Sequence, residues 1–276
     1  MLLLWSSNFI FAKYAVRELP IPIVVGLRYV FTGICMLPIV ALGRRNPRWS
    51  EHPVTWQAVA VGVLGLVGNQ VLFIIGISMT SVAHASMMTA LSPVLVMLGS
   101  ALWGLERITW VRVLGVVIAA SGVVVLQFSR GGTGGAHWSG DLVMLASVVV
   151  FAAFNLLGKP IAERLGSIRM NAISYTASAA LAVPLVVWHW NRTAGASSVA
   201  WIGVVYMAVG SSVLGYLIYA HALRYLPASR VAVVLYLQPL VASLLAILLL
   251  GERPGVGFVP AAALVLGGVW TAERHA

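Results

Sequence analysis

Charged residues are scarce in this 276-residue chain. Asp, Glu, Lys and Arg make up only 9% of it and hydrophobic residues 61%, whereas a soluble domain carries about 25% charged residues. A chain with so little polar surface cannot cover itself in water, so the lipid bilayer is its natural solvent. The single cysteine, Cys35, lies inside an apolar run, which excludes a disulfide framework.

Acidic residues are scarcer than basic ones. Seven Asp and Glu stand against seventeen Lys and Arg, and all seven map to loops or to the ends of apolar runs. The basic residues fall mostly in short gaps between apolar runs, which indicates membrane orientation rather than nucleic-acid binding. The chain has no His-Glu-x-x-His, Gly-x-Ser-x-Gly or P-loop motif. We therefore expect no cofactor, no metal and no ATP-driven pumping.

Long apolar runs fill the rest of the chain. A helix needs about 20 apolar residues to cross the hydrocarbon core, and ten runs reach or approach that length. They are 1–16, 23–42, 54–77, 83–105, 109–128, 142–161, 170–189, 199–223, 231–250 and 256–272. The sequence thus predicts an all-α integral membrane protein with ten transmembrane helices. With the N-terminus in the cytoplasm, ten basic residues fall in cytoplasmic segments and four in outer ones, so both termini are expected in the cytoplasm.

The second half of the chain repeats the pattern of the first at an offset of 146 residues. The matching pairs are Pro93 and Pro239, Glu106 and Glu252, Lys13 and Lys159, and Gly122 and Gly268. We expect a first five-helix repeat at 1–130, a Gly-rich linker at 131–140 and a second repeat at 141–276. Because five is odd, the second copy enters the membrane upside down. Two inverted repeats are the architecture of many secondary transporters.

These features together resemble the EamA-type branch of the drug/metabolite transporter superfamily. The resemblance lies in the Trp-Ser-Ser-Asn-Phe opening from Trp5 to Lys13, the Leu-Arg-Tyr at 27–29, the two repeats and the Glu-Arg after spans four and nine. The second half departs from the opening, with Ala-Ala-Phe-Asn at 152–155. The resemblance implies a multi-pass carrier of the bacterial inner membrane, often an amino-acid exporter, with a cavity lined by spans one, three, four, six, eight and nine.

Polar side chains inside membrane spans are costly, so each is a candidate site residue. The alternative for each is a hydrogen bond that ties two helices together. The candidate substrate-binding residues are Trp5, Asn8, Asn69, Gln70, Phe73, His84, Met88, Asn155, Tyr216, Tyr219, Tyr236 and Gln238. His84 is the embedded group suited to proton coupling, or else a hydrogen-bonded packing histidine.

Four charged residues form two candidate gate pairs. Inversion would place Lys13 with Glu252 at the outer mouth and Lys159 with Glu106 at the inner one. If the first pair is an ion pair, exchanging its two charges should rescue transport. The alternatives are that the lysines snorkel to the headgroups, as we also expect of Arg28, and that each Glu favours the N-terminus of the next helix.

Pro93 and Pro239 each remove a backbone hydrogen bond inside a span, so the sequence predicts kinks there and suggests hinges. The lysines and neutral polar groups suit a substrate that bears a carboxylate. The sequence therefore favours a secondary carrier that works by alternating access and exports small polar metabolites, amino acids first among them.

Two other functions remain open. One is efflux of drugs or other metabolites. The other is an integral-membrane enzyme, which would need acid–base groups clustered at one depth. The expected partners are a small-molecule substrate and the lipid bilayer, with no nucleic acid and no obligate protein partner.

Overall fold

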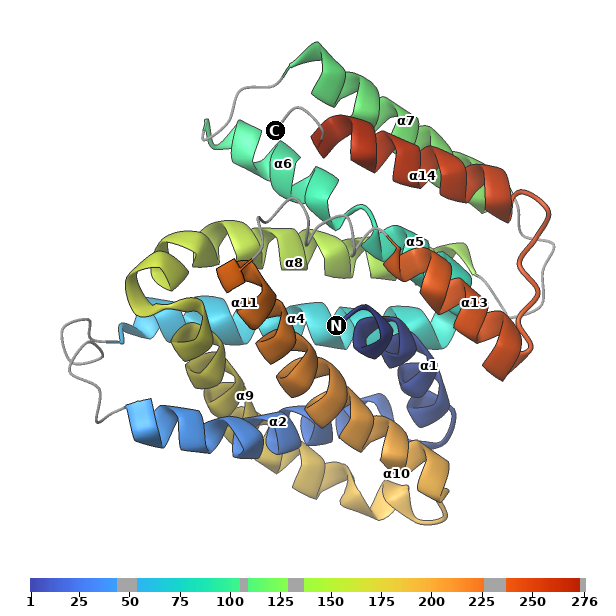
Figure 1. Cartoon of the computed structure of the whole chain (residues 1–276). Helices are drawn as coiled ribbons and strands as arrows, with labels where there is room; N and C mark the ends of the chain where they lie inside the picture. The colour runs from blue at the N-terminus through green and yellow to red at the C-terminus, as the bar shows by residue number, and fades with distance from the viewer. Residues whose placement is uncertain (44–53, 105–108, 129–136, 226–236, 274–276) are drawn as a thin grey trace.

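The computed structural model describes residues 1–43, 54–104, 109–128, 137–225 and 237–273, which contain helices and no β-strand (Figure 1). Each of the ten predicted stretches contains helix, and the all-helical fold class is confirmed for these residues. The elements are α1 (Leu2–Glu18), α2 (Ile21–Gly43), α4 (Trp56–Met79), α5 (Val82–Thr89), α6 (Ser92–Leu102), α7 (Trp110–Phe128), α8 (Trp138–Leu165), α9 (Ser167–His189), η1 (Trp190–Thr193), α10 (Ser198–Val205), η2 (Tyr206–Gly215), α11 (Tyr216–Tyr225), α13 (Gln238–Leu250) and α14 (Phe258–Glu273).

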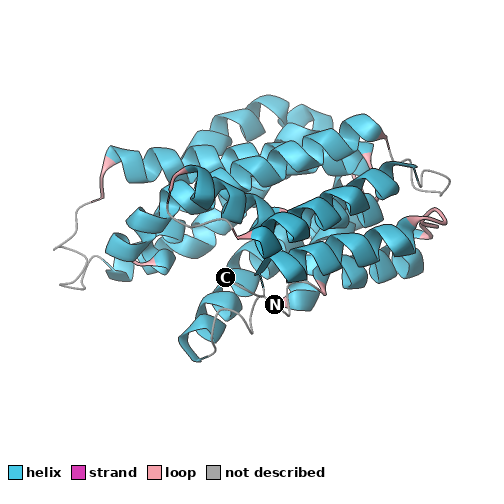
Figure 2. Ribbon diagram, turned by 90° about the horizontal axis from the view of Figure 1, so that it is seen from above, coloured by secondary structure: helices cyan, strands magenta, loops and turns pink. Residues whose placement is uncertain are grey.

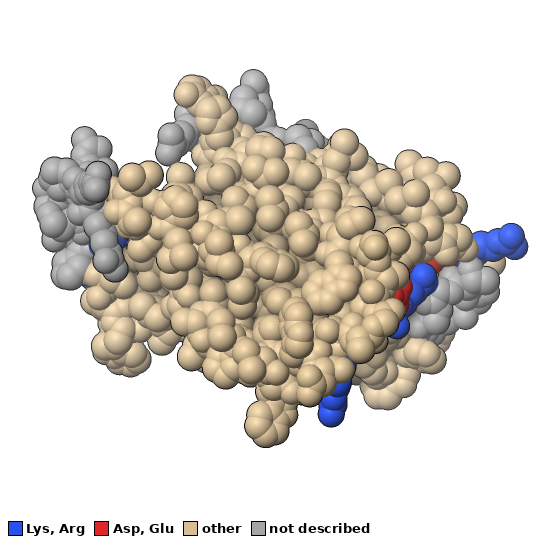
Figure 3. All heavy atoms as spheres, turned by 90° about the horizontal axis from the view of Figure 1, so that it is seen from below, with Lys and Arg blue, Asp and Glu red and all other residues tan. Residues whose placement is uncertain are grey.

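Within the described ranges, six helical stretches are long and apolar enough to cross a membrane: α2, α4, α5 with α6, α8, α9 with η1, and α10 through most of α11. Large apolar side chains stay exposed on their outer faces, among them Leu102 at 88% and Trp188 at 84%. Such a surface is costly in water but natural in lipid. Charged side chains lie near the margins of the face shown in Figure 3, which is otherwise uncharged.

Among the described residues, the most extensive contacts between the two halves of the chain are made by three helix pairs: α2 with α9, α4 with α8, and α7 with α14. The last pair lies side by side at the top of Figure 1, and Figure 2 shows the helices from above. Gly26 faces Val186 and Gly33 faces Ala179, so α2 and α9 run antiparallel. A β-carbon at either glycine would lie within 2.5 Å of its neighbour, so the pair packs this closely only because the side chains are absent.

The two prolines lie at helix starts rather than inside helices. Pro93 is in the first turn of α6, after a break at Ala90–Leu91, and Pro239 is in the first turn of α13. A first-turn proline loses no helical hydrogen bond, because its N–H would have no partner there. The prediction of mid-helix kinks is therefore corrected to a broken helix at Pro93. The residues that precede α13, 226–236, lie outside the described part of the chain.

Candidate functional site

The centre of the bundle contains a buried arginine. Arg28 of α2 is 4% exposed; its Nη1 donates to Gln70 Oε1 of α4 at 2.8 Å and its Nε to Ser212 Oγ of η2 at 3.1 Å. Gln70 in turn donates to Asn69 Oδ1 at 3.3 Å, and Asn69 donates to the carbonyl of Ser147 on α8 at 2.9 Å. The prediction that Arg28 snorkels is wrong, because its guanidinium is held inside by partners from both halves.

A stretch of π-helix supplies part of this network. In η2 the Ser212 hydroxyl donates to the carbonyl of Met207, five residues earlier, at 3.1 Å. The wider turn leaves the carbonyl of Ser211 to accept from Trp5 Nε1 at 3.1 Å. The rings of Trp5 and Tyr219 lie 5.5 Å apart, centroid to centroid. Side chains of α1 and α2 therefore meet neighbouring residues of a single irregular helix.

A second polar cluster surrounds the α4–α5 break, the short connection at Thr80 and Ser81 between the end of α4 and the start of α5. Lys13 is 8% exposed, and its ammonium donates to the carbonyls of Ile77 at 2.9 Å and Thr80 at 2.5 Å, at the C-terminal end of α4. Glu252 is 4% exposed, and its carboxylate accepts from the backbone N–H groups of Val82 and Ala83, at the start of α5. Each charge binds the helix end whose dipole it complements.

The Gly-Glu-Arg motif explains how Glu252 reaches this position. Gly251 has φ +66°, which the absence of a β-carbon permits, and it ends α13. The N–H of Glu252 then returns to the carbonyl of Ala246 at 3.2 Å. The carboxylate is thereby turned toward α5. Lys13 and Glu252 thus lie at the same break, but each binds backbone groups and neither lies within 4.0 Å of the other as an ion pair.

A buried carboxylate completes the cluster. Asp141, in the first turn of α8, is 2% exposed; its Oδ1 accepts from Thr80 Oγ1 at 2.5 Å and its Oδ2 lies 2.9 Å from His84 Nδ1. The sequence placed Asp141 correctly at the end of a run but gave no sign that it is buried. The structure therefore gathers Lys13, His84, Asp141 and Glu252 at one end of the bundle, where α1 and α4 end and α5 and α8 begin.

The other predicted site residues differ from one another in burial and in hydrogen-bond partners. Phe73 and Met88 are buried in the core, and Phe73 packs edge-on against Phe9. Asn8 is 8% exposed, and its Oδ1 has no hydrogen-bond partner in the described structure. Asn155 is exposed on α8 and donates to its own helix at Phe151 O.

The remaining predicted residues lie on α8, α11 and α13 or outside the described part of the chain. Gln238 is partly buried, and its backbone carbonyl accepts from Ser6 Oγ at 3.3 Å. Tyr216 accepts from Asn171 Nδ2 at 2.7 Å. Lys159 is exposed, whereas Glu106 and Tyr236 lie outside the described residues. The inner gate pair therefore stays a prediction, because Glu106 lies outside the described residues.

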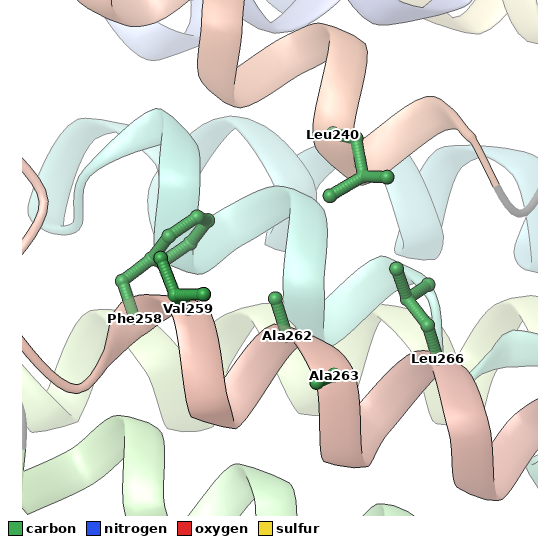
Figure 4. Close-up of a pocket in the computed structure, with 6 residues that line it drawn as sticks. All are labelled: Leu240, Phe258, Val259, Ala262, Ala263 and Leu266. Carbon is green, nitrogen blue, oxygen red and sulfur yellow. The ribbon is translucent and has the colours of Figure 1, made fainter.

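Two apolar pockets lie away from these clusters. One, of about 280 Å³, lies between Leu240 of α13 and a face of α14 that includes Phe258 and Leu266 (Figure 4). The other, of about 100 Å³, is lined by α6 and α7. Neither includes a residue of the Arg28 network. A polar substrate finds no hydrogen-bond partner in the first, so we place the candidate site at Arg28.

Curated relatives of this chain are named as transporters. An uncharacterized transporter of Archaeoglobus fulgidus is 28% identical over 274 residues, 98% of this chain and 95% of the relative. A probable terminal-alkyne amino-acid exporter of Streptantibioticus cattleyicolor is 28% identical over 234 residues, 85% and 77% of the two chains. The uncharacterized inner membrane transporter YedA of Escherichia coli is 25% identical over 258 residues, 91% of this chain and 80% of the relative.

A solved structure and a family pattern also match this chain. A solved crystal structure superposes with a TM-score of 0.69 over 100% of this chain and 94% of the other, at 22% identity, which shows a shared fold. The sequence pattern of the EamA-like transporter family matches residues 1–128 and residues 138–272. The resemblance seen in the sequence is thereby confirmed, and the chain belongs to the EamA-like transporter family.

Proposed function

We propose that the protein is a secondary carrier that exports small polar metabolites, amino acids first among them, by alternating access. The observation that carries the proposal is the Arg28 network, in which buried polar side chains of α2, α4 and η2 meet inside the bundle. Intramembrane polar groups of this kind mark substrate pathways. The exporter of amino acids among the relatives supports the same class of substrate.

The carrier is proposed to consist of ten spans in two inverted repeats, with both termini in the cytoplasm. Two separate matches to the family pattern support the repeat. So do the helix bounds: α2 begins at residue 21 and α9 at 167, α6 at 92 and α13 at 238, and each pair is 146 residues apart. The antiparallel pairing of α2 with α9 is what a two-fold axis in the membrane plane would produce.

The cluster at the α4–α5 break is proposed to be the outer gate. In it Lys13 and Glu252 bind the two sides of the connection between two successive spans, the end of α4 and the start of α5, and α8 and α13 contribute from the second half. Opening toward the outside requires these contacts to part. The buried Asp141 and His84 are an acid–base pair of the kind that a membrane enzyme needs, but they bind each other and the Thr80 hydroxyl, and the family of the chain supports transport.

Efflux from proteoliposomes tests the proposed function. Vesicles loaded with labelled amino acids should release at least one of them in a saturable way that protein-free vesicles do not show. Trp5→Ala should reduce that efflux, because it removes the ring that contacts Ser211 and Tyr219. The control is Trp110→Ala, whose side chain is 87% exposed. Absence of saturable efflux, or equal loss in the two variants, would refute the proposal.

A further inference from the structure

Arg28 is a buried cation without a carboxylate partner. It is the eighth residue of α2, about 10 Å along a helix that is long enough to span the membrane. Its two acceptors, Gln70 Oε1 and Ser212 Oγ, are both neutral. Neutral acceptors satisfy N–H groups but do not remove a charge, and an uncompensated charge is the costly part of burying an arginine.

The described carboxylates are all placed elsewhere. Glu18 and Glu163 are exposed. Asp141 and Glu252 bind at the α4–α5 break. No acidic side chain of the described residues lies within 4.0 Å of the Arg28 guanidinium. The counter-charge for Arg28 is therefore not supplied by any side chain that the structure describes.

The guanidinium still has unused donors in a fixed orientation. Nε and Nη1 each donate one hydrogen bond, and Nη2 has no partner among the described residues. The acceptors are themselves held, since Gln70 donates to Asn69 and Ser212 donates to Met207. The plane of the guanidinium is thus set before a ligand arrives. Its free N–H groups form the fork that binds a carboxylate through two parallel hydrogen bonds.

The ring of Trp5 binds η2 at the residue next to Ser212, the serine that accepts from Arg28. Its Nε1 donates to the carbonyl of Ser211. Tyr219 lies 5.5 Å from the Trp5 ring and 6.5 Å from that of Tyr216, centroid to centroid. Such rings accept apolar groups and cations on their faces. The chemistry of these groups matches a small zwitterion, whose carboxylate would bind Arg28 and whose remainder would lie against the rings.

We propose that Arg28 binds the carboxylate of the transported substrate, and that a carboxylate is required for transport. The assignment rests on the transport function proposed above and specifies its substrate class. A bound carboxylate provides the counter-charge that Arg28 lacks. The amide of the same compound leaves that charge uncompensated, so the amide is a poor substrate even though its size and side chain are nearly the same.

Parallel efflux of acids and amides tests the assignment. Proteoliposomes containing the full chain are loaded with the twenty amino acids or with their C-terminal amides, and leakage from protein-free vesicles is subtracted. The wild-type protein should release at least one amino acid about tenfold faster than its amide. Arg28→Gln should bring this ratio close to one, and Arg28→Lys, which keeps the charge but loses the fork, should give an intermediate ratio. Arg17→Gln, at the exposed end of α1, is the matched control.

The outcomes separate the assignment from the function beneath it. Equal release of acids and amides by the wild-type protein overturns the assignment and leaves a carrier of another specificity. Release of neither refutes the proposed function, and the assignment falls with it. The wild-type comparison needs no variant, so it decides the matter even if Arg28→Gln does not fold. A folded Arg28→Gln protein that keeps the acid-to-amide ratio shows that Arg28 only ties helices together, and also overturns the assignment.

Discussion

Exchange of the charges at Lys13 and Glu252 shows whether the two side chains form an ion pair or bind separate helix ends. If they formed an ion pair, the double variant Lys13→Glu with Glu252→Lys would recover what each single variant loses. In the structure Lys13 donates to carbonyls of Ile77 and Thr80, and Glu252 accepts from N–H groups at the start of α5. The exchange therefore places a carboxylate against carbonyl oxygens and an ammonium against N–H donors.

The size of the effect follows from these hydrogen bonds. A buried hydrogen bond to a charged group contributes about 1.5–3 kcal/mol, so each single change should destabilise the protein by at least that much. The double exchange should cost about the sum of the two, roughly 3–6 kcal/mol. Thermal unfolding of the purified protein and amino-acid efflux should both show no rescue. The control is Arg17→Glu, one turn beyond Lys13 and exposed. Recovery of stability and efflux in the double variant would refute the helix-end arrangement.

Two further predictions concern packing and pH. Gly268→Ala should lower the free energy of unfolding by about 1–3 kcal/mol, because its new β-carbon would fall 2.3 Å from the backbone N of Ala119. The control Gly267→Ala, whose β-carbon would have nothing within 4 Å, should be neutral or stabilising. Equal melting temperatures of the two variants would contradict the α7–α14 contact. At the end of α1, beyond the span predicted at 1–16, two hydrogen bonds from Ser197 lower the pKa of the exposed Glu18 carboxyl below 4.5. The stabilisation by the ionised Glu18 carboxylate should be complete above pH 4.5 and be lost as the pH falls through the lowered pKa. The melting temperatures of wild type and Glu18→Gln should therefore converge in acid. A difference that stays constant with pH would contradict the contact between Glu18 and Ser197.

Much of the fold was predictable because hydropathy and helix length are local properties. Each apolar run contains helix among its described residues, although the kink predicted at Pro93 is a break between two helices. The resemblance to the transporter family rested on short motifs whose spacing is also visible in the sequence. The starts of α2 and α9, and those of α6 and α13, are 146 residues apart, the same separation as Pro93 and Pro239, but the inverted repeat itself stays a prediction.

The site was less predictable because its contacts join distant segments. Arg28 meets partners 42 and 184 residues away, and no local pattern distinguishes that from snorkelling. Burial of Asp141 depends on Thr80 and His84 of another segment. The π-helix around Ser212 had no signal in the sequence that we recognised. The sequence thus indicated which residues were polar inside spans, but not which of them face one another.

Labelling of a single cysteine next to the Arg28 network tests alternating access most directly. Ser211→Cys, made in a Cys35→Ala background, leaves the Ser212 acceptor in place and puts the only thiol of the chain at a position that is 5% exposed. A membrane-impermeant maleimide should label it in right-side-out and in inverted vesicles, while Ser121→Cys on the exposed face of α7 should be labelled in neither. Labelling of Ser211→Cys from one side only, or from neither, would contradict a central site that opens to each side in turn.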